Sequence, residues 1–498
     1  MQMADHEERV FMAKNRTKKA ATDVKVPKAA SAELVWTGAD GTQLPYRATA
    51  SHVDVRKDDG SLVGKMFNLS FVVLSDGKPD VSRPVTFAFN GGPGSCSVPI
   101  DFGGIGPKRV RPNGLSHIAA DAPTEDNPQS IISCTDLVFL DAMTTGWSRA
   151  AEGVEDKDLF GIDADADCFA RAICAWLQDN GRWSSPVYLF GESYGTVRNA
   201  ALMRLLGERS VKLTGVVMLS AIFDWSQVQP GADAGYIGMM PTYAATAQHF
   251  GRAGVGIDVD TWFDQAMDFA EDVLAPALLK GDRLSVQKEH EVAEQLSHFI
   301  GIPVEHILAK HLRIDLTDFR ATLLVDEEKT CGRLDTRFVS DAPSYVQTSN
   351  DWLAAEDASD DAVDSVWVSA FRAFCADVLG YQSPARYMSN NYEKTLPGWK
   401  WSHTMPGAGE DASAPNMALD IAVTLRRDPT IKLAIIGGRY DAATTWWNVV
   451  HDLSSQFLSD EVKARIVWHR YGCGHMAYVD EETNEAMGAD LRTFYSMR

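Results

Sequence analysis

The stretch Gly191-Glu-Ser-Tyr-Gly195 decides the fold of this chain, because it fits the G-x-S-x-G pattern of a strand–turn–helix elbow. The residues before it, 186–190, are apolar and rich in β-forming side chains. After it, apolar residues recur at helical spacing from 197 to 206. The two glycines allow a cramped turn in which a side chain would collide with neighbouring backbone. The pattern therefore predicts a serine hydroxyl presented between a buried strand and a helix.

A nucleophilic serine needs a histidine base and a carboxylate that orients the base. In the fold that uses this elbow, the acid and then the histidine follow the serine along the chain. Asp441 comes just after an apolar strand, and His475 lies in a glycine-punctuated loop after another. Both would meet Ser193 at the carboxyl edge of the sheet, where α/β proteins bind ligands. His469 competes as the base, but its place within a strand makes it the poorer candidate.

The oxyanion that forms when a serine attacks a carbonyl needs two N–H donors. One is ordinarily the amide that follows the nucleophile, here Tyr194, and the other comes from a glycine-rich loop after an earlier strand. Asn90-Gly-Gly-Pro-Gly-Ser95 follows such a strand at 85–89. An ordinary turn is the alternative for a glycine–proline run. Its place directly after a strand, well before the elbow, favours an oxyanion loop.

Together these features resemble the serine carboxypeptidase family of the α/β-hydrolase fold, and its bacterial branch most closely. The motifs that carry the resemblance stand in the family's order: Asn90-Gly-Gly-Pro-Gly-Ser95, Gly106-Pro107, Asn127-Pro128, Leu137-Val-Phe-Leu-Asp141, Gly146-Trp-Ser148, Gly191-Glu-Ser-Tyr-Gly195, Asp441 and Gly474-His-Met476. The resemblance implies an α/β fold in which a mixed, mostly parallel sheet is flanked by helices and carries an inserted helical cap.

The resemblance also implies roles for individual residues. Ser193, Asp441 and His475 would form the catalytic triad, and the amides of Gly92 and Tyr194 would form the oxyanion hole. The implied substrate-binding residues are Asn90, Gly91 and Glu192 for the free C-terminal carboxylate of a peptide, with Trp147 and Met476 beside the side-chain pockets. Glu192 could hold a carboxylate only by sharing a proton with it, because adjacent like charges raise one pKa. The family uses no cofactor, and no metal-binding spacing occurs.

One position departs from the family pattern. Family members of eukaryotic type carry a second glutamate just before the Gly-Pro of the oxyanion loop, paired with the glutamate of the elbow. Here Gly104 stands at that place, and Asp101 is a nearby carboxylate that could compensate. The departure makes strict exopeptidase action a weaker prediction than hydrolase chemistry. An esterase, amidase or acyltransferase on the same triad is the main alternative, and a non-catalytic hydrolase-like binding protein is the third.

With 498 residues the chain exceeds one ordinary domain, so a core with an insertion is expected. Amphipathic helices replace strands after residue 225, and strand signals resume near 431. The predicted divisions are a polar, flexible N-terminal tail at 1–30, the first part of the core at 31–225, a helical cap that roofs the active site at 226–410, and the second part of the core at 411–498.

The net charge of −21 argues against a nucleic-acid partner, which would require a basic surface. No apolar stretch is long enough to span a membrane, and the N-terminus lacks the apolar core of a secretory signal. The seven cysteines are scattered and odd in number, which is typical of reduced thiols. These features predict a cytoplasmic protein, and the family resemblance implies that its partner is a peptide substrate with a free C-terminus. A homodimer is a further expectation.

Overall fold

The computed structural model describes residues 25–229, 231–342, 357–407 and 414–497. The polar tail predicted at 1–30 lies almost wholly outside the described residues. The core is a sheet of 11 strands with the order β1-β2-β3-β8-β5-β10-β11-β14-β15, and β4 and β9 both pair with β3. Its strands are β1 (Ala30–Thr37), β2 (Gln43–Arg56), β3 (Leu62–Ser75), β4 (Lys78–Pro79), β5 (Val85–Phe89), β8 (Asp136–Leu140), β9 (Arg149–Ala150), β10 (Val187–Glu192), β11 (Leu213–Leu219), β14 (Lys432–Gly438) and β15 (Ile466–Tyr471).

Strands β8, β5, β10, β11, β14 and β15 run parallel, whereas β1, β2 and β3 pair antiparallel. Every residue of β5, β8, β10 and β14 is buried, because both faces of a parallel sheet are covered. Strand β2 instead alternates between buried and more exposed residues over much of its length, as expected for a strand with one face on the core. The predicted mixed, mostly parallel sheet is confirmed.

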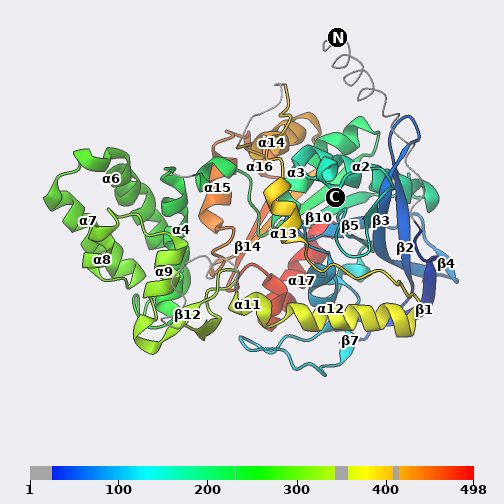
Figure 1. Cartoon of the computed structure of the whole chain (residues 1–498), viewed down its shortest axis with the longest axis horizontal. Coiled ribbons are helices and arrows are strands. Elements are labelled where there is room, and N and C mark those ends of the chain that lie inside the picture. Colours follow the sequence, from blue (N-terminus) through cyan, green and yellow to red (C-terminus); the bar gives the residue numbers. More distant parts are fainter. Residues whose placement is uncertain (1–24, 230, 343–356, 408–413, 498) are drawn as a thin grey trace, which may run out of the picture.

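Helices cover both faces of this sheet (Figure 1). One face packs against α2 (Ile162–Asp179), α3 (Tyr194–Glu208), α14 (Ala418–Arg427) and α15 (Trp446–Ser454). The other packs against α12 (Asp364–Ala373) and α17 (Glu481–Ser496). Short elements complete the description: α11 (Ala358–Asp361), α13 (Tyr392–Thr395), α16 (Asp460–Lys463), and the two-stranded pairs β6 (Lys108–Val110) with β7 (Thr124–Asp126) and β12 (Lys329–Cys331) with β13 (Val339–Asp341).

The segment predicted as a single cap divides into two parts. A helical lobe projects from one side of the sheet and has its own hydrophobic core (Figure 1). It consists of α4 (Ala234–His249), α5 (Val259–Phe269), α6 (Ala275–Lys280), α7 (Val286–Ile300), α8 (Val304–Ala309) and α9 (Leu316–Thr322). In contrast, Trp367 and Phe371 of α12 belong to the hydrophobic core of the sheet itself. The sequence did not predict this division, because an apolar helical stripe does not reveal which surface it covers. A roof over the active site stays a prediction.

The two ends of the insertion are joined to each other. Asp224 and Asn416 form an isolated antiparallel bridge, and the Asn416 side chain donates to the Asp224 carboxylate at 3.2 Å. Next to them, the Met417 amide donates to the Phe223 carbonyl at 2.7 Å. The chain therefore leaves the sheet after β11 and returns beside it before α14, so that β11 and β14 pair directly.

His403 ties the returning segment to the core. Its ring is fully buried between Asp163 of α2, 2.5 Å from Nδ1, and Asp420 of α14, 3.0 Å from Nε2. Burial disfavours the imidazolium, but the two carboxylates outweigh it and raise the pKa of His403 to about 9. The protonated ring can donate to both carboxylates at once, so it links three parts of the chain.

We expect this histidine to make stability depend on pH. Its folded pKa lies above the unfolded value of about 6.5, so its contribution is complete below pH 6.5 and is lost as pH rises through about 9. The loss should be on the order of 2 kcal/mol, and His403→Gln should abolish this part of the pH dependence. Urea unfolding midpoints from pH 6 to 10 measure it, with His290→Gln at an exposed position as the control. Parallel curves for wild type and His403→Gln would contradict the expectation.

Among the described residues, no helix is long and apolar enough to cross a membrane. All seven cysteines are free thiols in the structure.

Candidate active site

The elbow is built as its sequence predicts. Ser193 lies between β10 and α3 with φ +59° and ψ −129°. This is a strained backbone conformation that residues other than glycine rarely adopt. A Cβ atom at Gly191 would lie 2.3 Å from the carbonyl oxygen of Gly195, and one at Gly195 would lie 2.9 Å from that of Phe89. Only glycine therefore fits on either side of the serine. Ser193 is partly exposed although its neighbours in the motif are buried.

Asp441 and His475 meet in a hydrogen bond of 2.8 Å between Oδ2 and Nδ1. The aspartate is fully buried and its oxygens also accept the amides of Ala443 and Thr444 and the Thr444 hydroxyl. A carboxylate can only accept, so His475 carries its proton on Nδ1 and leaves Nε2 free to take one. Burial disfavours the imidazolium, but the Asp441 carboxylate outweighs it and raises the pKa of His475. An imidazole held in this way can accept a proton at Nε2.

The end of β11 anchors the segments that carry Ser193 and His475. The amide of Ser193 donates to the carbonyl of Leu219 at 3.0 Å, and the hydroxyl of the next residue, Ser220, donates to the carbonyl of His475 at 2.6 Å. The hydroxyl of Thr444, which also contacts Asp441, lies 2.9 Å from the Ser220 carbonyl. The three predicted triad residues therefore follow neighbouring strands and converge on one strand end. His469 is paired with Asp490 of α17, 3.1 Å away, instead.

The predicted oxyanion loop lies against the elbow. A Cβ atom at Gly91 would be 2.3 Å from the amide nitrogen of Tyr194, so this loop approaches the elbow as closely as backbone allows. Gly92 has φ +104°, which favours glycine. The buried Arg198 of α3 donates to the Asn90 carbonyl at 2.9 Å. The loop that contains Gly92 is thus held beside the amide of Tyr194.

Arg198 was not predicted from the sequence. It forms a buried pair with Asp165 of α2 at 2.7 Å, and its guanidinium packs over the ring of Phe169 at 4.1 Å. It lies within the helix that follows the elbow, where its spacing gives no signal of a functional role. Its contact with the oxyanion loop joins residues that are 108 positions apart in the chain.

Asn90 and Glu192, predicted to bind a carboxylate, lie in one buried cluster with Tyr478. Glu192 is only 2% exposed, and its Oε2 accepts the Tyr478 hydroxyl at 2.8 Å. Burial raises the pKa of Glu192 to about 7, against the opposing effects of His475 and of hydrogen bonds from Tyr478 and Asn90. Glu192 can therefore exchange a proton near neutral pH. No sequence pattern marked Tyr478 as part of this cluster.

Two other predicted residues lie differently. Trp147 is buried in an aromatic cluster with Phe67 and Tyr387, at ring distances of 5.1 and 4.8 Å, and its indole donates to the Ala385 carbonyl. Its side chain contributes to the hydrophobic core and also lines a cavity of about 470 Å³, so its place beside a substrate pocket stays a prediction. Met476 follows His475 and is 7% exposed, so its place beside a pocket stays a prediction.

Asp101 does not replace the missing glutamate. It is 1% exposed, and neither of its carboxylate oxygens has a hydrogen-bond partner among the described residues. Burial and the nearby Asp141 raise its pKa well above the ordinary value, which disfavours its ionised form. The structure thus gives no support to compensation by Asp101.

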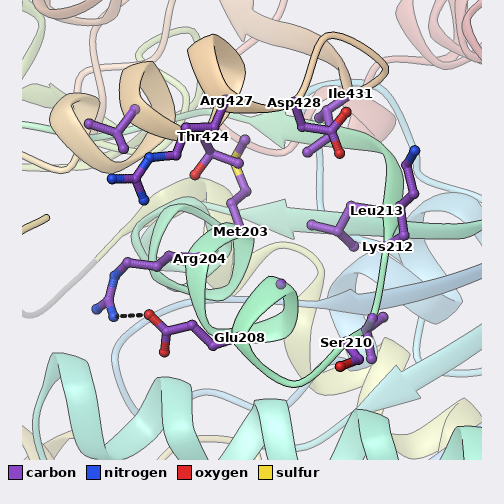
Figure 2. A pocket seen from close by; sticks show the side chains of 13 residues that line it. Met203, Arg204, Glu208, Ser210, Lys212, Leu213, Thr424, Arg427, Asp428 and Ile431 are labelled. Atoms are coloured by element: carbon purple, nitrogen blue, oxygen red, sulfur yellow. Dashed lines mark hydrogen bonds and ion pairs between the residues drawn. The ribbon is translucent and has the colours of Figure 1, made fainter.

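A cavity of about 490 Å³ lies elsewhere in the molecule (Figure 2). Its lining includes Met203 and Arg204 of α3 and Leu213, the first residue of β11. The triad residues follow the opposite, carboxyl ends of their strands, so this cavity is separate from the candidate active site. Among the described residues, no group of three metal-binding side chains occurs.

Comparison with known proteins found a similar family and a similar fold. Residues 41–222 match the model of the serine carboxypeptidase family. A prohormone-processing carboxypeptidase from Saccharomyces cerevisiae has the same fold, with a TM-score of 0.54 and 16% identity over 90% of this chain and 91% of that chain. A carboxylesterase from Bacillus subtilis matches at a TM-score of 0.34 and 10% identity, over 90% of this chain and 92% of that chain. No curated protein gives a significant sequence match. The predicted resemblance and the α/β-hydrolase fold are confirmed.

Proposed function

From the premise that this chain is a serine carboxypeptidase-like hydrolase, we propose that it hydrolyses the C-terminal peptide bond of peptides through Ser193, His475 and Asp441. The observation that carries the proposal is the hydrogen-bonded pair of Asp441 and His475, which is fixed to the same strand end as the strained elbow. The match of residues 41–222 to the family supports the peptide as substrate. The match stops before Asp441 and His475, so their assignment rests on the geometry.

Nε2 of His475 takes the proton of the Ser193 hydroxyl while the serine oxygen bonds to the carbonyl carbon of the scissile peptide. The oxyanion that develops is stabilised by the amides of Gly92 and Tyr194. His475 then gives the proton to the leaving amine, and an acyl-enzyme remains. Water, deprotonated by His475, attacks the acyl group and regenerates Ser193. Asp441 holds the imidazole in the required tautomer throughout.

Asn90, the amide of Gly91 and Glu192 supply the site for the C-terminal carboxylate in this proposal. The carboxylate and an ionised Glu192 would repel each other, so capture requires the neutral form of Glu192. That form is accessible because burial raises the pKa of Glu192 to about 7. Capture of the free C-terminus directs cleavage to the last peptide bond, which distinguishes an exopeptidase from an endopeptidase.

Glu192→Ala should lower kcat/KM for free-acid peptides by about 10- to 100-fold, because it removes a hydrogen bond to a charged group. Peptides with an amidated C-terminus have no carboxylate to bind, so their kcat/KM should change only a few-fold. The measurement is hydrolysis of matched free-acid and amidated peptides below pH 6. Equal losses on both substrates would contradict carboxylate capture by Glu192.

A second function remains open on the same catalytic residues. Gly104 leaves the cluster without the second glutamate of the family, which favours an esterase, amidase or acyltransferase as the alternative. Mass spectrometry of a mixed peptide library, incubated with wild type and with Ser193→Ala, separates these activities. Serine-dependent loss of single C-terminal residues supports the carboxypeptidase. Intact peptides together with serine-dependent ester hydrolysis would support the alternative. A peptide substrate, a homodimer and a cytoplasmic location all stay predictions.

A further inference from the structure

Tyr478 occupies the space beside Gly104. A Cβ atom at Gly104 would lie 3.0 Å from Cδ1 and 3.3 Å from Cε1 of the Tyr478 ring. A larger side chain at position 104 and the ring of Tyr478 therefore compete for the same volume. The departure from the family at Gly104 is thus matched by an aromatic side chain that enters from the loop after His475.

The hydroxyl of Tyr478 completes a buried cluster. It donates to Oε2 of Glu192 at 2.8 Å, and both residues are almost completely buried. The Asn90 side chain lowers the pKa of both residues. Tyr478 is three positions after His475, and it joins the loop of the base to the elbow of Ser193. Among the described residues, no other residue of the histidine loop donates a side-chain hydrogen bond to Glu192.

We propose that Tyr478 is the positioning residue that fixes Glu192 for capture of the peptide's C-terminal carboxylate, in the place of a second carboxyl group. This inference rests on the proposed function. With Oε2 accepting from Tyr478, the proton of neutral Glu192 belongs on Oε1, from which it can be donated to the substrate. A phenol retains its own proton over the working pH range, whereas a carboxyl partner would titrate together with Glu192.

The groups around the cluster set its pH dependence. The charges of His475 and Asp441 shift the pKa of Glu192. The charge of Asp360 of α11 shifts the pKa of Tyr478 and also interacts with the charge of His475. Burial raises the pKa of Tyr478 well above 10, so Tyr478 remains a donor. Neutral Glu192 is lost as pH rises through about 7. In wild type, kcat/KM for free-acid peptides should therefore fall above pH 7, whereas that for amidated peptides should not.

Tyr478→Phe tests the inference through this pH profile. Loss of the phenol removes a hydrogen bond that stabilises ionised Glu192, so its pKa should rise further. The alkaline limb of the kcat/KM profile for free-acid peptides should therefore move to higher pH by roughly one unit. Below pH 6 the same substrates should lose about tenfold in kcat/KM through a higher KM, because Glu192 is less well oriented. Amidated peptides should stay within about twofold at every pH.

Two further variants make the result decisive. Tyr387→Phe removes another buried phenol that donates to a carboxylate, that of Asp141 at 3.1 Å, and should leave the pH profile unchanged. Gly104→Ala inserts a methyl group against the Tyr478 ring and should shift the limb in the same direction as Tyr478→Phe. It also serves as the test if Tyr478→Phe does not fold.

An unshifted alkaline limb in both Tyr478→Phe and Gly104→Ala would overturn the inference, as would equal losses on free-acid and amidated peptides. Failure of the proposed function has a different signature. In that case wild type itself would show no preference for free-acid peptides below pH 7, and Ser193-dependent hydrolysis would be confined to other substrates.

Discussion

Ser193→Ala is expected to lower kcat for peptide hydrolysis by about a million-fold, the size of effect measured when the nucleophile of another serine protease is removed. The reason is that the side chain of Ser193 forms the bond to the scissile carbonyl, and no neighbouring residue can take its place at the strained position between β10 and α3. Alanine can be accommodated there without a change in the flanking glycines. The variant should therefore fold normally, and its melting temperature should remain close to that of wild type.

Release of C-terminal residues, measured with high enzyme concentrations and long incubations, quantifies this loss. A fluorophosphonate probe should label wild type at Ser193 and leave Ser193→Ala unlabelled. Ser455→Ala, at an exposed position after α15, should retain full activity and labelling. Residual activity within tenfold of wild type in Ser193→Ala would show that another residue is the nucleophile.

Asp441→Asn should lower kcat by about 10⁴-fold at neutral pH, again by analogy with triads elsewhere. The carboxylate of Asp441 accepts four hydrogen bonds, from His475, from two backbone amides and from Thr444. An asparagine has only one oxygen. If that oxygen serves the amides, its NH₂ group faces Nδ1 of His475 and forces the proton to Nε2. The imidazole then cannot accept the proton of Ser193.

Thr444→Val is the control for this prediction, because it removes a hydroxyl from the same carboxylate while it retains the charge. We expect a loss of about tenfold, since the contacts of one neutral hydroxyl with Asp441 and with the Ser220 carbonyl are lost while the carboxylate remains. The pH dependence of kcat for amidated peptides separates the two variants. Thr444→Val should keep the acidic limb that reports His475, whereas Asp441→Asn should shift it toward lower pH. Equal losses in both variants would contradict the assigned role of Asp441.

The sequence was sufficient to predict the positions of those site residues that are marked by local spacing. The elbow, the glycine-rich loop after β5, and the aspartate and histidine after β14 and β15 each have a short pattern next to a strand. Parallel strands then bring their carboxyl ends to the same edge. For this reason Asp441 and His475 could be paired before any coordinates were known, although 34 residues separate them.

Tyr478 and Arg198 could not be found in this way. Their decisive contacts join positions 286 and 108 residues apart, and neither residue type is specific for a role in catalysis. An aromatic residue near a motif can fill a pocket or the core, and Trp147 packs against Phe67 and Tyr387 while it also lines a cavity. The division of the helical insertion was hidden by the same ambiguity.

The antiparallel bridge between Asp224 and Asn416 has a consequence for the evolution and redesign of this protein. Since the lobe begins and ends at adjoining points of the scaffold, helices can be gained, lost or grafted there without lengthening the path between β11 and β14. We expect changes in that lobe to leave the pairing of β11 with β14 and the hydrogen bond between Asp441 and His475 intact.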